Sequence, residues 1–311
     1  MEERTRLIIR TSWIGIIGNS VLSILKIVLG LVSGSLAVVG DGIDSAGDII
    51  TSWITLFTAR IISRPPDARY AYGYAKADSL ATMVLAFIIF FAGTQLAIST
   101  VTQLIKGNYT EIPSLLAIYV TAVSIAGKLV LSYIHFRVGK RINSSMLIAN
   151  GKNMQNDVII SVGVLIGLFF TQVLQLPVID KAVALLISIW IMRVGLKVFL
   201  HTNIELMDGV KDMALYDQII RAVNRIPHAG NPHRMRIHQI GTSYMISCDI
   251  EVEGNITVNE SHDIAKRVEE SIKTEIGNVY DVMVHVEPAG NIEREVYGVS
   301  DQDVKKNNPG K

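Results

Sequence analysis

Three aspartates interrupt an otherwise apolar segment, Leu36–Ala59, that is long enough to cross a lipid bilayer as a helix. They are Asp41, Asp44 and Asp48. Ionised carboxylates at membrane depth are costly unless a counter-charge accompanies them. A helix turns positions four apart onto one face, so Asp44 and Asp48 are expected to point the same way. A divalent cation is the counter-charge that best suits two converging carboxylates.

The apolar residues are concentrated in the first two thirds of the chain. Half of the 311 residues are hydrophobic and 18% are charged, which is too apolar for an ordinary soluble domain of this length. Six runs are each long enough to span a bilayer as a helix: Ile8–Val32, Leu36–Ala59, Leu80–Ile105, Ile112–Val138, Val158–Leu176 and Ile179–Leu200. The sequence therefore predicts a polytopic α-helical membrane protein whose residues 1–204 form six transmembrane helices.

Lysine and arginine are unevenly distributed among the connections. They are found at the N-terminus, between the second and third runs, and between the fourth and fifth runs, whereas the alternate connections hold only Lys106. The positive-inside rule places both termini in the cytoplasm, and we expect the chain to reside in the cytoplasmic membrane. The first run lacks the features of a removable signal peptide. The single cysteine, Cys248, excludes an internal disulfide and fits a core position.

Residues 205–290 have the mixed composition of a soluble domain. Helical spacing of apolar residues, then two alternating strands, a second helix and a last strand give the order αββαβ. Thr257 and Glu260 have the spacing of a capping box at the start of the second helix. This pattern predicts a small α+β domain with helices on one face of an open sheet. Residues 291–311 lack an apolar pattern and are expected to be disordered.

A second polar pair, Asn153 and Asp157, is found at the start of the fifth run and also has a spacing of four. With Asp44 and Asp48 it offers three carboxylates and one amide, all oxygen donors of the kind that hard or borderline divalent ions prefer. The alternative is that the acidic residues pair with buried lysines, for which Lys26 in the first run and Lys128 in the fourth run are candidates. The metal interpretation is favoured because two helices repeat the same spacing.

The expected depths of the two pairs are compatible. At 1.5 Å per residue, Asp48 lies about 18 Å below Leu36. Asp157 lies about 28 Å from Leu176, but about 21 Å if the membrane boundary is at Thr171–Gln172. The second boundary would bring both carboxylates to one level.

Several segments resemble one known family. The stretch SGSLAVVGDGIDSAGD in the second run, YGYAKADSLA before the third, the Asn153–Asp157 pair and the terminal αββαβ domain are similar to cation diffusion facilitators, which exchange divalent metal for protons. The resemblance covers residues from about 8 to 290. It implies a metallochaperone-like cytoplasmic domain, a homodimer, and a transport site that leaves Asp41 outside and consists of Asp44, Asp48, Asn153 and Asp157.

The resemblance also implies what the protein binds. Divalent metal would be the substrate and a possible cytoplasmic regulator, protons and the lipid bilayer would be the other partners, and no permanent cofactor, nucleic acid or enzymatic activity is expected. Zinc-transporting members usually carry histidine at the place of Asn153. An amide there weakens the preference for zinc, which favours Mn²⁺ or Fe²⁺, with Zn²⁺ as the alternative. Members with an accessory loop site carry histidines at the places of Tyr70 and Tyr74, so with only Asp67 left we expect no such site.

The C-terminal domain carries a second set of candidate ligands. By resemblance a cytoplasmic metal site would use residues that are ordinary surface side chains on the alternative interpretation: His233, Asp249, His262, His285 and Glu287. For His238 the surface interpretation is preferred. The resemblance further suggests a charge pair between Lys76 and Asp208 that interlocks the membrane and soluble domains between protomers, although Lys76 is also explained as a positive-inside residue.

Two other functions share part of this pattern. An intramembrane aspartyl protease also needs two membrane carboxylates, but it needs them as an acid–base pair on facing helices rather than at a spacing of four. A metal-sensing membrane scaffold would share every motif and differ only in moving no ions.

Overall fold

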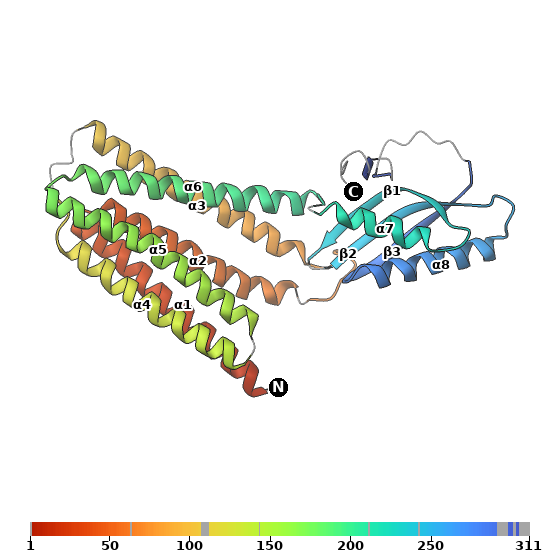
Figure 1. The fold of residues 1–311 in the computed structure, drawn as a ribbon, viewed down its shortest axis with the longest axis horizontal. Coiled ribbons are helices and arrows are strands. Elements are labelled where there is room, and N and C mark those ends of the chain that lie inside the picture. Colours follow the sequence, from red (N-terminus) through yellow and green to blue (C-terminus); the bar gives the residue numbers. More distant parts are fainter. Residues whose placement is uncertain are drawn as a thin grey trace. The chain divides into compact units, whose positions relative to one another are not determined.

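The computed structural model describes residues 2–62, 64–106, 112–142, 144–210, 212–241, 243–290, 298–300 and 303–304 (Figure 1). The chain divides into two compact units. The membrane unit comprises Met1–Ala59 and Ala81–Leu200, and the C-terminal unit comprises Arg60–Leu80 and His201–Lys311.

Six long helices account for most of the first two thirds of the chain, and their bounds are α1 Glu2–Ser33, α2 Leu36–Ile62, α3 Lys76–Ile105, α4 Leu116–Arg141, α5 Ser145–Leu174 and α6 Val178–Leu206. Within the described residues, five of them are long and apolar enough to cross a membrane. The other, α2, has 27 residues and carries the three aspartates. The polytopic fold predicted from the sequence is confirmed.

Close approach between helices in the membrane unit depends on glycine. The helix α4 packs against both α1 and α5, which are drawn beside it in Figure 1. At Gly42 of α2, an added Cβ would lie 2.7 Å from Cγ1 of Ile27 in α1. At Gly195 of α6, it would lie 2.9 Å from the backbone nitrogen of Phe90 in α3. These contacts bring α2 against α1, and α6 against α3.

The helix α5 begins well before the apolar run that predicted it. The run begins at Val158, whereas the helix begins at Ser145, where the Ser144 side chain accepts a bond from the backbone of Leu147. The polar residues of the first turns form no apolar run, so the membrane-length pattern could not show them. Asn153 and Asp157 therefore lie inside a continuous helix.

The C-terminal domain has the predicted order αββαβ, with α7 Ala214–Asn224, β1 Gly230–Ile240, β2 Ser243–Val252, α8 Val258–Glu275 and β3 Val279–Pro288. The strand order is β1-β2-β3, with β1 and β2 antiparallel and β2 and β3 parallel. Thr257 and Glu260 form the capping box that starts α8. In Figure 1 both helices run along the sheet, and α7 packs against α8 and β1.

One hydrophobic core holds this domain together. It joins buried side chains of both helices, such as Ile219 and Val268, to strand residues such as Ile246. Cys248 belongs to this core and is fully buried, as its alternation along the strand predicted. Burial, with a smaller contribution from the charge of Asp249, raises the pKa of its thiol to about 12, so this cysteine is structural rather than reactive.

Part of the C-terminal tail packs on the domain. Val299 forms an antiparallel bridge with Met235 of β1, and Val304 is 3% exposed within the core. The sequence predicts disorder for the whole segment 291–311. The described residues 298–300 and 303–304 are packed instead, because two valines reach the edge of the core, and the rest of that segment lies outside the described residues.

Candidate metal centre

The polar pairs of α2 and α5 approach one another inside the membrane unit. The carboxyl groups of Asp48 and Asp157 lie close enough to share a hydrogen bond, and the charge of Asp44 interacts with that of Asp157. Asp157 is 7% exposed, and Asp44 and Asp48 are half-buried. The structure thus places Asp48 beside Asp157 across two helices, with Asp44 near them, but the ligand oxygens of the three carboxylates do not all lie within 4.8 Å of one another.

A cavity of about 380 Å³ adjoins this cluster and is lined by residues of α1, α2, α4 and α5. Asp48 and Asn153 both line it. Asn153 of α5 thus borders the same space as Asp48 of α2, although Asn153 itself is exposed. Oxygen donors around an accessible space are what a hard divalent ion requires.

A histidine in the same cavity was missed at the sequence level. His135 of α4 is 1% exposed and lines the cavity, and its Nδ1 lies 2.9 Å from the carbonyl oxygen of Leu131. A carbonyl can only accept, so Nδ1 carries the proton and Nε2 keeps its lone pair, which is the orientation that metal-binding histidines commonly have. A lone histidine in an apolar run carries no sequence signal that distinguishes this position from a packed core residue.

Both buried lysines pair with aspartates. Lys128 Nζ lies 2.7 Å from Asp157 Oδ2, and Lys26 Nζ lies 2.8 Å from Asp41 Oδ2. The alternative of lysine pairing therefore applies to Asp41, which the resemblance places outside the ligand set, and also to Asp157. Over the described part of the chain, neither Asp44 nor Asp48 forms an ion pair with a lysine, although the charge of Lys128 acts on both carboxyl groups.

The predicted cytoplasmic site is partly assembled. His233, Asp249 and Glu287 offer ligand atoms that all lie within 4.8 Å of one another, and this is the one such group found among the described residues. His233 is 5% exposed, not the solvated side chain of the alternative interpretation. His285 lies beside the group, with Nε2 3.5 Å from Glu287 Oε1. His262 is exposed on α8 and lies outside the group.

An arginine also occupies this cluster. Arg234 Nη1 lies 3.1 Å from Asp249 Oδ2 and 3.6 Å from Glu287 Oε1. Strand alternation does not predict it, because Arg234 and His233 are neighbours that would point to opposite faces of a regular strand. The register of β1 against β2 shifts on either side of His233, and Arg234 has φ of 48°, so the alternation is broken there.

Lys76 and Asp208 form a pair within one chain. Lys76 Nζ lies 2.9 Å from Asp208 Oδ1, and the two side chains are 41% and 39% exposed. His238 Nδ1 lies 2.7 Å from the same oxygen and its ring packs on Tyr72, so His238 is not a free surface side chain. All of these residues belong to the C-terminal unit. An exposed pair contributes little to stability by itself.

The carboxylate of Asp67 is engaged in its own turn. It accepts bonds from the Tyr74 hydroxyl at 2.6 Å and from the backbone of Arg69 and Tyr70. These bonds, the Tyr74 one foremost, hold the pKa of Asp67 below its ordinary value. Asp67, the one candidate ligand in the loop before α3, therefore stabilises its own turn.

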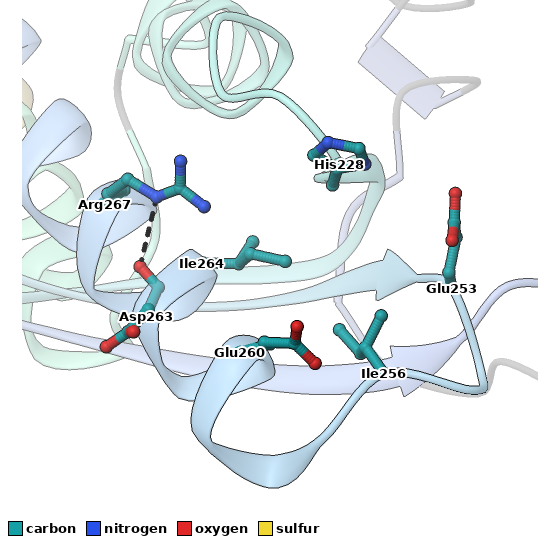
Figure 2. A pocket seen from close by; sticks show the side chains of 7 residues that line it. All are labelled: His228, Glu253, Ile256, Glu260, Asp263, Ile264 and Arg267. Carbon is teal, nitrogen blue, oxygen red and sulfur yellow. Dashed lines mark hydrogen bonds between the residues drawn. The ribbon is translucent and has the colours of Figure 1, made fainter.

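A hollow of about 280 Å³ lies at the start of α8 (Figure 2). Its lining includes His228 and the carboxylates of Glu253, Glu260 and Asp263. Figure 2 shows Glu260 at the first turn of the helix, where bonds from the Thr257 backbone and then its side chain lower the pKa of Glu260. Glu260 thus caps a helix, and among the described residues no group with metal-ligand spacing includes these four.

A membrane bundle with converging carboxylates and a soluble αββαβ domain defines the class of the protein as a metal-transporting membrane protein. Residues 12–207 match the cation efflux transmembrane domain, and residues 212–289 match the cytoplasmic domain of cation efflux proteins. The chain belongs to this family, the cation diffusion facilitators, and divalent metal ions are its substrates.

Individual relatives cover nearly the whole chain. An uncharacterized transporter, YdbO of Bacillus subtilis, is 32% identical over 86% of this chain and 91% of its own length. The manganese efflux system protein MneS of the same organism is 28% identical over 86% of this chain and 91% of its own length. A solved structure, the metal-bound C-terminal domain of the CzcD transporter from Thermotoga maritima, is 38% identical over 26% of this chain and 94% of that one, with a TM-score of 0.25.

Proposed function

We propose that this protein exports Mn²⁺ or Fe²⁺ from the cytoplasm across the cytoplasmic membrane in exchange for protons, without any covalent step. The observation that carries the proposal is the meeting of Asp48 and Asp157 beside a cavity that Asn153 also lines. Three carboxylates and an amide supply only oxygen ligands, which suit these ions. The similarity to a relative named as a manganese efflux protein supports manganese.

The proposed mechanism is a competition for one set of oxygens. Facing the cytoplasm, the ionised carboxylates of Asp44, Asp48 and Asp157 bind the dehydrated metal ion. Facing the other side, protons bind the same oxygens and remove the charge that held the metal. With Asp44 and Asp48 protonated and Asp157 paired with Lys128, the empty carrier then returns through the membrane without an unpaired charge. Tilting of helices about a site at the middle of the membrane would expose it alternately to each side.

The remaining features of the proposal concern orientation and assembly. The basic connections between α2 and α3 and between α4 and α5 support cytoplasmic termini. The soluble domains would pair two copies of the chain, and metal at His233, Asp249 and Glu287 would favour one state of the carrier. In a pure sensing scaffold the same sites would bind metal, but no ions would cross.

Flux in reconstituted vesicles tests the site. With a pH gradient imposed, Asp157→Ala and Asp48→Asn should each reduce Mn²⁺ flux to the level of empty vesicles, because each removes a carboxylate from the cluster. Asp48→Asn leaves the Lys128–Asp157 pair intact and so separates transport from folding. Asp263→Ala, an exposed aspartate on α8, serves as the control and should transport normally. Normal flux from both site variants would refute the assignment.

Zinc is the second candidate substrate, and His135 is the observation that favours it. An imidazole Nε2 in the same cavity would supply the nitrogen ligand that the asparagine lacks. Replacing Asn153 by histidine should raise the ratio of Zn²⁺ to Mn²⁺ flux by about tenfold, since nitrogen ligands favour zinc. A ratio that does not move in competition assays would reject the argument from ligand type.

A further inference from the structure

Lys128 is a buried cation in contact with the carboxylate cluster. It lies on α4, is 1% exposed, and donates to Asp157 Oδ2 at 2.7 Å and to Ser45 Oγ at 2.9 Å. Ser45 is the neighbour of Asp44 on α2. The ammonium group thus bridges the two helices that supply the ligands. A buried lysine needs such partners, because an uncompensated charge at membrane depth is costly.

The other buried lysine provides a comparison. Lys26 Nζ contacts Asp41 Oδ2 and donates to Ser161 Oγ at 2.9 Å, and Ser161 in turn donates to Asp41 Oδ1 at 3.0 Å. That network closes on itself, since Lys26, Ser161 and Asp41 all bind one another. Lys128 differs in one respect: its partner Asp157 is also a proposed ligand of the transported ion.

The charges of the cluster add up to that of a divalent site. With all three carboxyls ionised, as metal binding requires, Asp44, Asp48 and Asp157 contribute three negative charges and Lys128 contributes one positive charge, which leaves a net charge of minus two. One divalent ion neutralises this sum. Without the lysine the sum would be minus three, and a bound divalent ion would leave one negative charge buried in the bilayer.

We propose that Lys128 is the built-in counter-cation of the transport site: it holds Asp157 when no metal is bound and matches the charge of the site to a divalent ion. This inference rests on the proposed function. An arriving ion must draw Asp157 Oδ2 away from the ammonium group, which keeps its bond to Ser45 Oγ as that happens. Lys128 therefore lowers the affinity for metal, which favours release, and it stabilises the empty carrier.

Metal binding to the purified full-length chain tests this role. Free Mn²⁺ is measured by electron paramagnetic resonance in a His233→Ala background, which disables the cytoplasmic cluster. Lys128→Gln still donates a hydrogen bond but has no charge, and it should tighten Mn²⁺ binding by about tenfold because the competing cation is gone. Lys26→Gln, the comparison variant, should change binding less than Lys128→Gln does, since Lys26 pairs with Asp41 outside the ligand set and acts on Asp44 and Asp157 only through space.

Charge and size are separated by further variants. Lys128→Arg keeps the charge and should stay within about threefold of the unsubstituted chain. Lys128→Gln should also improve the binding of Tb³⁺ relative to Mn²⁺, because the net charge of minus three in its site matches that of a trivalent cation. Ser45→Ala removes the second partner of the ammonium group and should weaken Mn²⁺ binding severalfold. This last variant tests the proposal even if Lys128→Gln does not fold.

The outcomes distinguish the two proposals. If Asp157→Ala abolishes Mn²⁺ binding but Lys128→Gln binds no more tightly than the unsubstituted chain, the role of Lys128 is refuted and the site stands. The role is equally refuted if Lys128→Gln fails to fold and Ser45→Ala binds normally. If Asp157→Ala binds Mn²⁺ normally, the proposed function itself fails.

Discussion

The thiol of Cys248 is surrounded by core side chains of the cytoplasmic domain, and burial raises its pKa from an ordinary 9.0 to about 12. The unfolded chain loses this proton near pH 9.0, whereas the folded domain keeps it until about pH 12. Between these values the unfolded state binds fewer protons, so the contribution of this group to stability is complete below pH 9.0 and is lost as the pH rises.

The stability of the domain should therefore fall in that window. The expected slope from this one group is about 1.4 kcal/mol per pH unit. Thermal unfolding of the full chain followed from pH 8 to pH 11 checks it, with Cys248→Ala as the comparison, which should lack this part of the loss. Native protein at pH 9 should also resist alkylation by N-ethylmaleimide until denaturant is added. Rapid alkylation of the native thiol would contradict the buried position.

Ligand candidates and two candidate lysine partners could be predicted from the sequence, but which carboxylate pairs with which lysine could not. A spacing of four fixes a shared helix face whatever the surroundings, which is why Asp44 with Asp48 and Asn153 with Asp157 were found. Whether Asp157 meets a metal or Lys128 depends on which helices are neighbours, and a single sequence does not contain that. Arg234 was missed because an irregular register turns it toward the acidic cluster.

At the scale of elements, the contact between α3 and α6 depends on the absence of a side chain. A Cβ added at Gly195 would meet the backbone nitrogen of Phe90 at 2.9 Å and the backbone oxygen of Ala86 at 3.0 Å. Backbone atoms cannot turn aside as a side chain does, so the two helices would have to separate. By contrast, nothing lies within 4 Å of the corresponding position at Gly163 on α5.

These two glycines give a matched pair of substitutions. Gly195→Ala should destabilise the membrane unit by about 1–3 kcal/mol through overpacking. Gly163→Ala should leave it unchanged or stabilise it by up to about 1 kcal/mol, since alanine is the better helix former. Thermal midpoints of the detergent-solubilised proteins provide the measurement. Equal midpoints for the two variants would show that α3 and α6 do not approach as closely as described.

Apolar runs and caps predicted the elements unequally well. The capping box at Thr257 gave the start of α8 correctly because the signal is local. The start of α5 was placed too late, because its first turns are polar. An apolar run marks only the part of a helix that can lie in the membrane, not the whole helix. The parallel pairing of β2 with β3 follows from how α8 returns the chain, which strand patterns do not encode.

At the scale of the whole chain, the connection between α2 and α3 belongs with the C-terminal unit. The sequence boundary grouped this connection with the membrane segments of residues 1–204. Three contacts explain its placement: Lys76 with Asp208, the ring of Tyr72 with His238, and Ala75 with the turn at Gly241. Composition changes near Glu205 but cannot show that an earlier loop packs against the later domain.

The packing of Val304 has a practical consequence for anyone who prepares the soluble domain alone. A fragment that ends at Pro288, where the last strand of the sheet ends, lacks Val299 and Val304. Met235 and the apolar side chains around it would then be exposed to solvent. Fragments of that kind tend to aggregate. An expression fragment should instead run past residue 304, with any affinity handle attached beyond it.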